Sequence, residues 1–220
     1  MTWLSPAFPV GGFSYSHGLE LAVDAGLVGN AHDLAEWTAM LLTVGSGRVD
    51  AILLSHAWRA ERDGDDAAAA ETATLADACR GTAELALESR AQGEAFLAAV
   101  RDGWPDPALD AYAQLLARIG RPPAYACVVG VAAAIADIPE HVVRVAFLHA
   151  FAAAMVTAGV KLIPLGQRAG LAVLAGLEPA ILTTARAAGE SSLGDIASST
   201  WMIDWASAAH ESLYTRLFRS

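Results

Sequence analysis

The chain has 220 residues, of which 55% are hydrophobic and 17% charged, and its formal net charge is −10. A chain of this length buries enough surface to form one stable domain without a disulfide or a structural metal. The acidic balance excludes the basic stripe with which nucleic-acid binders neutralise phosphates, so we expect no nucleic-acid partner.

Two cysteines, Cys79 and Cys127, are too few for the disulfide framework of a small secreted protein. Residues 1–8 lack the basic start of a secretory signal peptide. The longest apolar runs, Ala124–Ala136 and Val145–Val160, are shorter than the roughly 18 to 20 residues that a membrane-spanning helix needs. We therefore expect a cytoplasmic protein without a membrane partner, in which both runs are buried core helices.

Helix-period patterns recur along the first half of the chain, and no stretch alternates as a β-strand does. A stripe that includes Leu34 and Trp37 predicts a helix whose N-cap is Asn30. The stripe is interrupted at residues 45–47 and then resumes. Further helices are expected over residues 66–102.

In the second half, Asp106 and Pro107 predict the N-cap and the first residue of another helix. Two prolines separate it from an apolar helix over 125–135. The next pattern starts near residue 138, runs to Val160 and is apolar on nearly every side, which is typical of a helix enclosed by others. A proline break, two shorter helices and a C-terminal amphipathic helix follow. We predict an all-α, single-domain bundle over residues 1–220, with about ten helices around this apolar central helix.

The sequence contains no phosphate-binding loop, dinucleotide fingerprint, nucleophile elbow or paired metal-ligand motif. His17 and Glu20, spaced i,i+3, would share a helix face. His149 lies within the apolar helix and is expected to be a hydrogen-bonded core histidine rather than a ligand. His210, beside Glu211, is expected to be a surface or partner contact rather than half of a catalytic pair. We therefore predict no catalytic residue and no metal ligand.

The residue composition of Ser5–Glu20 is more specific than the packing of a helix alone would require. Its two prolines and two adjacent glycines fix an irregular backbone, and Phe13 and Tyr15 are residue types that anchor interfaces. The alternative is a helix N-terminus capped by Ser14 or Ser16, which accounts for one serine only. We interpret the segment as an interaction surface.

Two further segments have a residue composition that is similarly specific. Val160–Gln167 is a proline break directly after the most apolar helix, although its Lys161 could simply interact with the last carbonyls of that helix. Chain ends usually fray, yet His210–Ser220 holds Leu217 and Phe218 between two arginines. These two side chains would expose apolar surface unless a partner covers them.

At these segments the sequence resembles the UreF family of urease accessory proteins. Ser5–Glu20 matches the family's Ser-Pro-x-x-Pro-[IV]-Gly-[GA]-Phe-[ST]-[YH]-Ser-x-Gly-[LI]-Glu segment almost throughout. Residues 88–93 are similar to its Glu-x-Arg-x-x-Gly stretch, residues 160–167 to its Val-[RK]-Leu-x-Pro-Leu-Gly-Gln motif, and residues 210–220 to its His-Glu-x-x-Tyr-x-Arg-Leu-Phe-x-Ser terminus. The chain departs from the family at residues 168–171, where Gln-Thr-x-Gly-Gln often continues, and at Ala209, where arginine is common.

The resemblance implies an all-α, homodimeric protein with no chemistry of its own. Such proteins bind a UreD/UreH-type accessory protein and a nickel-carrying GTPase of the UreG type. The resulting complex delivers nickel to apo-urease as the GTPase hydrolyses GTP. The partners would therefore handle nickel and GTP, and this chain would need no cofactor.

We assign partner contact to residues from these four motifs. They are Phe13, Ser14, Tyr15, Ser16, His17, Glu20, Glu88, Arg90, Lys161, Pro164, Gly166, Gln167, His210, Glu211, Tyr214, Arg216, Phe218 and Arg219. The group from Phe13 to Glu20 is expected at a partner or dimer surface, and the group from Lys161 to Gln167 at the face for the GTPase or scaffold. Residues 1–12 and 210–220 are expected to order only with a partner, the latter on the UreD/UreH-type protein.

Two alternatives remain open. The chain could activate the GTPase by inserting an arginine finger, for which Arg90 and Arg168 are the candidates. It could instead be an all-α enzyme or ligand-binding bundle with a pocket near His149, lined by convergent polar groups. A filled centre around residues 147–156 would exclude that second alternative.

Overall fold

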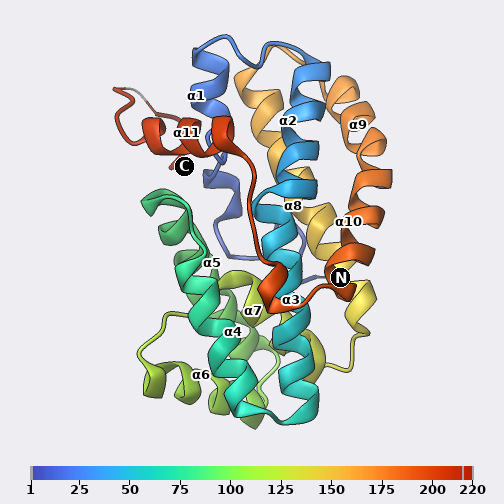
Figure 1. The fold of residues 1–220 in the computed structure, drawn as a ribbon. Helices are drawn as coiled ribbons and strands as arrows, with labels where there is room; N and C mark the ends of the chain where they lie inside the picture. Colours follow the sequence, from blue (N-terminus) through green and yellow to red (C-terminus); the bar gives the residue numbers. More distant parts are fainter. Residues whose placement is uncertain (1, 215, 220) are drawn as a thin grey trace.

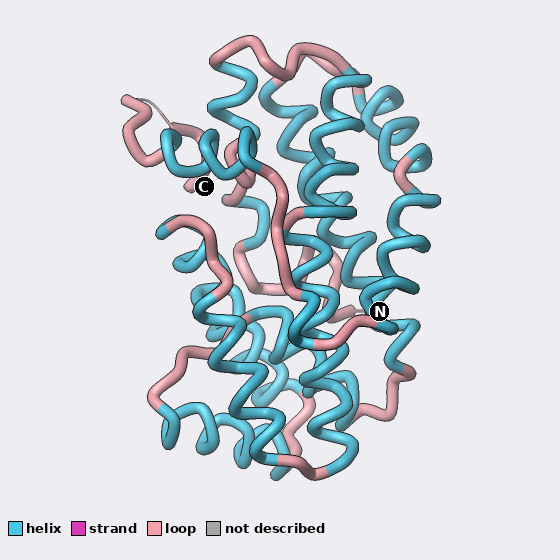
Figure 2. Tube along the Cα trace, viewed as in Figure 1, coloured by secondary structure: helices cyan, strands magenta, loops and turns pink. Residues whose placement is uncertain are grey.

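The computed structural model describes residues 2–214 and 216–219, and of Phe13 only the backbone. Within these residues it contains α-helices, two short 3-10 helices (η) and no strand, which confirms the all-α prediction (Figures 1 and 2). The elements in chain order are η1 (Gly12–Ser14), α1 (Leu19–Asp24), α2 (Ala31–Val44), α3 (Ser46–Asp63), α4 (Asp66–Ala78), α5 (Ala83–Gly103), α6 (Pro107–Ile119), α7 (Tyr125–Ile135), α8 (Glu140–Leu162), α9 (Gln167–Gly176), α10 (Glu178–Glu190), η2 (Leu193–Asp195) and α11 (Trp201–His210).

Local sequence signals set several helix starts where they were predicted. The Asn30 side chain accepts hydrogen bonds from the backbone N–H groups of His32 and Asp33, which satisfies donors that the first turn of α2 leaves unpaired. Asp106 caps α6 in the same way, and Pro107 occupies its first position. These starts depend on residues only two or three positions apart, so the sequence alone predicts them.

The hydrophobic core consists of two clusters that meet along α3. One cluster joins α3 to α4–α7 and the start of α8, with Leu53 and Leu54 as α3 members. The other joins α3 to α1, α2, α8–α11 and the tail, with Ala51 and Ile52 as α3 members. Figure 1 shows the same arrangement, with α4–α7 around the lower half of α3 and α2, α8, α9 and α10 around the upper half of the molecule.

The prediction that the apolar helix α8 is the enclosed central helix is wrong. Only 39% of its most apolar window is buried, and His149 on this helix is exposed rather than a hydrogen-bonded core residue. The helix that other helices surround is α3, with α7 packed directly against it. The α8 backbone runs beside the core, and one of its faces is left uncovered.

Three helical stretches are long and apolar enough, by length and composition, to cross a membrane: Ala31–Asp63, Glu140–Leu162 and Gln167–Glu190. No stretch of sufficient length was expected from the sequence, because the uninterrupted apolar runs are shorter than the helices that contain them. In this fold the three stretches pack against other helices, with 67%, 39% and 33% of their most apolar windows buried. The absence of a membrane partner stays a prediction.

Candidate functional site

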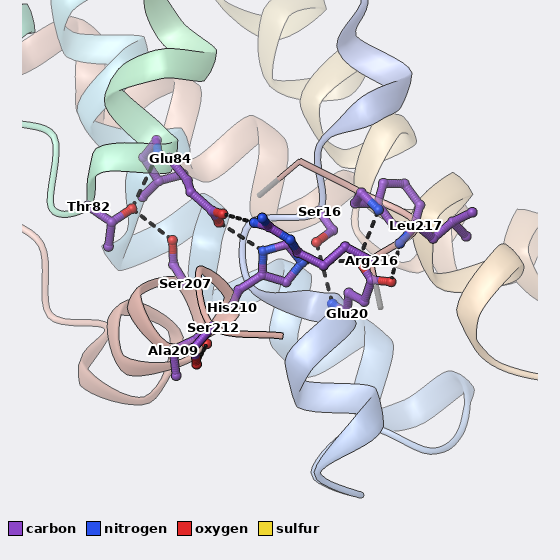
Figure 3. Close-up of polar contacts among 12 residues, drawn as sticks. Ser16, Glu20, Thr82, Glu84, Ser207, Ala209, His210, Ser212, Arg216 and Leu217 are labelled. Carbon is purple, nitrogen blue, oxygen red and sulfur yellow. Dashed lines mark hydrogen bonds and ion pairs between the residues drawn. The ribbon is translucent and has the colours of Figure 1, made fainter. Parts of the chain in front are cut away.

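Two of the predicted segments, the N-terminal motif and the C-terminal tail, meet at the start of α5 around His210 (Figure 3). Although it ends α11, His210 is fully buried. Its Nδ1 lies 2.9 Å from Glu84 of α5, and its Nε2 lies 3.0 Å from Glu20 of α1. The expectation that His210 makes a surface contact is therefore wrong for the isolated chain.

The His210 ring bridges two carboxylates. A neutral imidazole carries one N–H donor, but both ring nitrogens of His210 face carboxylate oxygens at hydrogen-bond distance. Each nitrogen thus lies within hydrogen-bond distance of a different carboxylate, so the ring links α11 to α1 and α5 at the same time. Burial raises the pKa of Glu20. The hydrogen bonds with His210 and with the Leu217 and Phe218 N–H groups together lower the pKa by more than burial raises it, so the net shift is downward.

The tail after α11 is held by the same two carboxylates. Glu20 accepts hydrogen bonds from the backbone N–H groups of Leu217 at 2.7 Å and Phe218 at 2.9 Å. Arg216 donates to the second oxygen of Glu84 at 2.8 Å. We call the set Glu20, Glu84, His210 and Arg216, with these two N–H groups, the tail latch. It joins parts of the chain that are up to 198 positions apart.

Apolar contacts and one further backbone bond complete the docking of the tail. Phe218 is buried, and the Lys161 ammonium lies 5.6 Å from the centre of its ring. The Arg219 N–H donates to the Ser14 carbonyl at 2.7 Å. Through Lys161, the tail thus contacts the end of α8, which brings the motif over residues 160–167 to the tail and the N-terminal motif.

Gly18 allows α11 to approach the N-terminal motif. Its backbone has φ = +75°, which side chains disfavour, and a Cβ atom there would lie 2.7 Å from the backbone nitrogen of Ser207. The Ser207 hydroxyl in turn lies 2.8 Å from the hydroxyl of Thr82, the N-cap of α5. A glycine in the motif is therefore required at the point where α1, α5 and α11 meet.

A second buried polar group lies one helical turn further along α5. His17 Nε2 is 3.1 Å from Glu88, and Gln92 donates to the same carboxylate oxygen at 2.9 Å. His17 precedes α1 with φ = +51° and does not share a helix face with Glu20, so that expectation is wrong. Beside this group, Arg80 and Asp50 form a buried ion pair at 2.8 Å.

The His17–Glu88 pair predicts a pH dependence. Burial lowers the pKa of His17, but the charge and hydrogen bond of Glu88, with the charge of Asp50, outweigh burial and raise it above 6.5, against a smaller lowering by Arg80. Because the folded pKa is raised, the pair stabilises the fold fully below pH 6.5 and loses this effect as pH rises through the folded pKa. The difference in unfolding free energy between the wild type and His17→Asn should therefore shrink as pH rises, measured by urea denaturation from about pH 6 to pH 9. A constant difference would contradict the assignment.

Most of the remaining predicted partner residues are either buried or exposed, whereas Ser14 is half-buried and the side chain of Phe13 lies outside the described part of the chain. Tyr15, Ser16, His17 and Glu88 are buried within the chain, so in this conformation they support the docked segments from inside. Exposed positions are Arg90, Lys161, Pro164, Gly166, Gln167, Glu211, Tyr214, Arg216 and Arg219. Partner contact by either group stays a prediction, as does partner-dependent ordering of residues 1–12 and 210–220. The described tail residues pack on their own chain here.

Two parts of the site were missed from sequence. Glu84 stands outside the recognised motifs, and its carboxylate could have been suspected only from its i,i+4 spacing with Glu88. The second is an exposed apolar patch on α11 and the turn after α1, formed by Leu27, Trp201, Met202 and Trp205. Trp201 is 86% exposed, which is unusual for tryptophan and typical of an interface.

Within the described residues, no group of three or more His, Cys, Asp or Glu side chains is placed to hold a metal ion. The two ring nitrogens of His210 are both engaged with carboxylates. The latch connects α1, α5, α11 and the tail, and the His17 group connects the N-terminal motif to α5. A cavity of about 420 Å³ lies between the His17 group and α8 and includes His149 in its wall, so the centre around residues 147–156 is not filled. The ligand-binding alternative is thus not excluded.

Comparison with known proteins identifies the family. A family model described as UreF matches residues 28–178. Over 224 residues, the chain is 46% identical to the urease accessory protein UreF of Rhodopseudomonas palustris strain BisB5, with 100% of this chain and 89% of the relative covered. It is 48% identical over 221 residues to UreF of Bradyrhizobium sp. strain BTAi1, covering 100% and 90%. For UreF of Magnetococcus marinus strain MC-1, identity is 44% over 226 residues, covering 100% and 95%. Since the family model spans more than half of the chain and the relatives align with all of it, the chain belongs to the UreF family of urease accessory proteins.

Proposed function

We propose that the chain is a non-enzymatic adaptor in urease maturation. In this role it joins a UreD/UreH-type accessory protein to a UreG-type GTPase, so that their complex delivers nickel to apo-urease. The chain would act in the cytoplasm, as a homodimer, and nickel and GTP would be handled by its partners. Support comes from membership of the UreF family and from the polar groups of the site, which bind segments of this chain to one another.

The observation that carries the proposal is the apolar patch beside the latched tail. Trp201, Met202 and Trp205 are 86%, 57% and 53% exposed on one helix, and the latch residue His210 ends that helix. Tryptophans that protrude in this way are typical of the few residues that supply most of the binding energy of an interface. The latch would present the patch and the tail as one surface for the UreD/UreH-type protein.

Co-purification with the UreD/UreH-type protein tests this surface. Deletion of residues 211–220, or the double change Trp201→Ser and Trp205→Ser, should each weaken the complex by about 30-fold or more, because each removes central contacts. The matched control is Leu182→Ser on α10, which is 53% exposed but far from α11. Affinity can be measured by biolayer interferometry. Wild-type affinity in the tail-deleted chain would remove the assignment.

The exposed segment after α8 is the proposed face for the UreG-type GTPase. Pro164, Gly166 and Gln167 are exposed there, and Arg168 is exposed with no hydrogen bond or ion pair to the described residues. This favours Arg168 over Arg90 as a candidate arginine finger, because Arg90 is held by Asp77 at 2.7 Å. GTP turnover by the purified partner, with wild type and with Arg168→Ala, decides between a GTPase activator and a passive adaptor. Equal turnover with and without this chain would exclude the activator.

A further inference from the structure

The cavity beside α8 is separate from the α11 patch. It lies between the N-terminal segment over residues 4–12, one face of α5 and α8 from Phe147 to Lys161. Its volume of about 420 Å³ falls within the range of small-molecule sites, roughly 300–1,000 Å³. None of the residues of the α11 patch lines it.

The side chains of α8 explain why this space is open and apolar. Ala150, Ala154 and Ala158 follow one another along the wall, and their small side chains leave room beside Phe147 and Phe151. Ala150, Phe151 and Ala154 are only half-buried, although they belong to a strongly apolar helix. Their apolar surface faces the cavity instead of another helix. An apolar molecule there would remove this surface from water, which is favourable.

One polar group in the wall lacks a partner. Ser89 is 7% exposed and lines the cavity, and its Oγ has no hydrogen-bond partner among the described residues. Leaving a buried hydroxyl unpaired is unfavourable, whereas a hydroxyl can both donate and accept. A ligand with one hydrogen-bonding group next to Ser89 would satisfy it.

The charges at the inner end of the cavity select against an anionic ligand. Asp50 and Glu88 line this end, together with Arg80 and His17. Each positive or titratable group already faces a carboxylate, Arg80 at 2.8 Å from Asp50 and His17 at 3.1 Å from Glu88. Neither of these two groups remains free to receive a carboxylate or phosphate, and Lys161, a further cation in the wall, lies over the Phe218 ring, so a neutral head beside Ser89 is favoured.

We propose that this cavity binds a small neutral molecule with an apolar ring body against α8 and a hydroxyl head hydrogen-bonded to Ser89. Tyr125 and Phe147, whose ring centres lie 5.6 Å apart, form an aromatic part of the wall that suits a ring. The site is independent of the adaptor role, because its ligand is a small molecule and the adaptor surfaces recognise proteins.

Three probes that share one ring body test the head and the body separately. They are 2-naphthol with a hydroxyl, naphthalene with no head and 2-naphthoate with a charged head, each titrated into the full chain. We expect 2-naphthol to bind about fivefold tighter than naphthalene, the value of one hydrogen bond, and 2-naphthoate to bind weakest. Ser89→Ala should make 2-naphthol and naphthalene equal. Equal affinity of all three probes for the wild type, or no binding, would overturn the proposal.

Filling the cavity by mutation provides a second test of the proposed site. Ala154→Leu places a larger side chain in the wall and should abolish binding of 2-naphthol, while Ala172→Leu on the exposed surface of α9 should leave it unchanged. Amide chemical-shift mapping of the wild type with 2-naphthol does not depend on either variant folding. Shift changes centred on Ser89 and Ala154 support the site, and changes centred on Trp201 and Trp205 would refute it.

Discussion

Replacing His210 with alanine is expected to release the tail and to lower the free energy of unfolding by about 3–5 kcal/mol. The His210 ring is fully buried between Glu20 and Glu84, whose side chains are only 11% and 10% exposed. Alanine would leave two buried carboxylates facing one another, with Arg216 as the remaining cation of the latch. Guanidinium denaturation measures the loss, and amide hydrogen exchange of residues 216–219 should rise because their anchor Glu20 is no longer held in place.

The neighbouring residue offers a control for the His210 change. Glu211 follows His210 directly, is exposed and takes no part in the latch, so Glu211→Ala should change the unfolding free energy by no more than about 0.5 kcal/mol. Tail protection in His210→Ala equal to that of the wild type would show that Phe218 and its apolar contacts hold the tail without the latch. The latch would then be a consequence of docking rather than its cause.

The sequence predicted local helix starts better than it predicted contacts between distant segments. Hydrophobic periodicity and cap residues act over three or four positions, so the helix starts at Asn30 and Asp106 could be predicted. The contact between Glu20 and His210 spans 190 positions, and no local pattern specifies it. A histidine next to a charged, basic chain end reads as a surface residue unless the chain is known to fold back.

Hydropathy also misidentified the central helix for a physical reason. It counts how apolar a helix is, not whether protein, a cavity or solvent lies beside it. Helix α3 carries Asp50, Arg59 and Arg62, which lower its average, yet each is paired, with Arg80, Glu140 and Asp137 respectively. Pairing lets a charged helix occupy the centre. In contrast, α8 is strongly apolar, yet one of its faces lines a cavity instead of packing against other helices.

The second large effect is expected at Gly130, where α7 contacts α3. Gly130→Ala should destabilise the protein by about 2–4 kcal/mol, measured by guanidinium denaturation. A Cβ atom at this position would overlap the backbone carbonyl oxygen of Leu54 and lie 3.2 Å from the backbone nitrogen of Trp58. Backbone atoms inside a helix cannot rotate away as a flexible side chain can, so the two helices would have to separate.

The sign of this effect makes the test decisive, because local and tertiary preferences oppose each other. In an isolated helix, alanine is favoured over glycine by about 1 kcal/mol, so helix propensity alone predicts a more stable protein. Gly176→Ala isolates that preference, since nothing lies within 4 Å of a Cβ there and the residue ends the exposed helix α9. Stabilisation in both variants would mean that α7 does not sit against α3 as described. Loss at Gly130 with gain at Gly176 would show that close backbone contact between α3 and α7 joins the core around α4–α7 to the central helix.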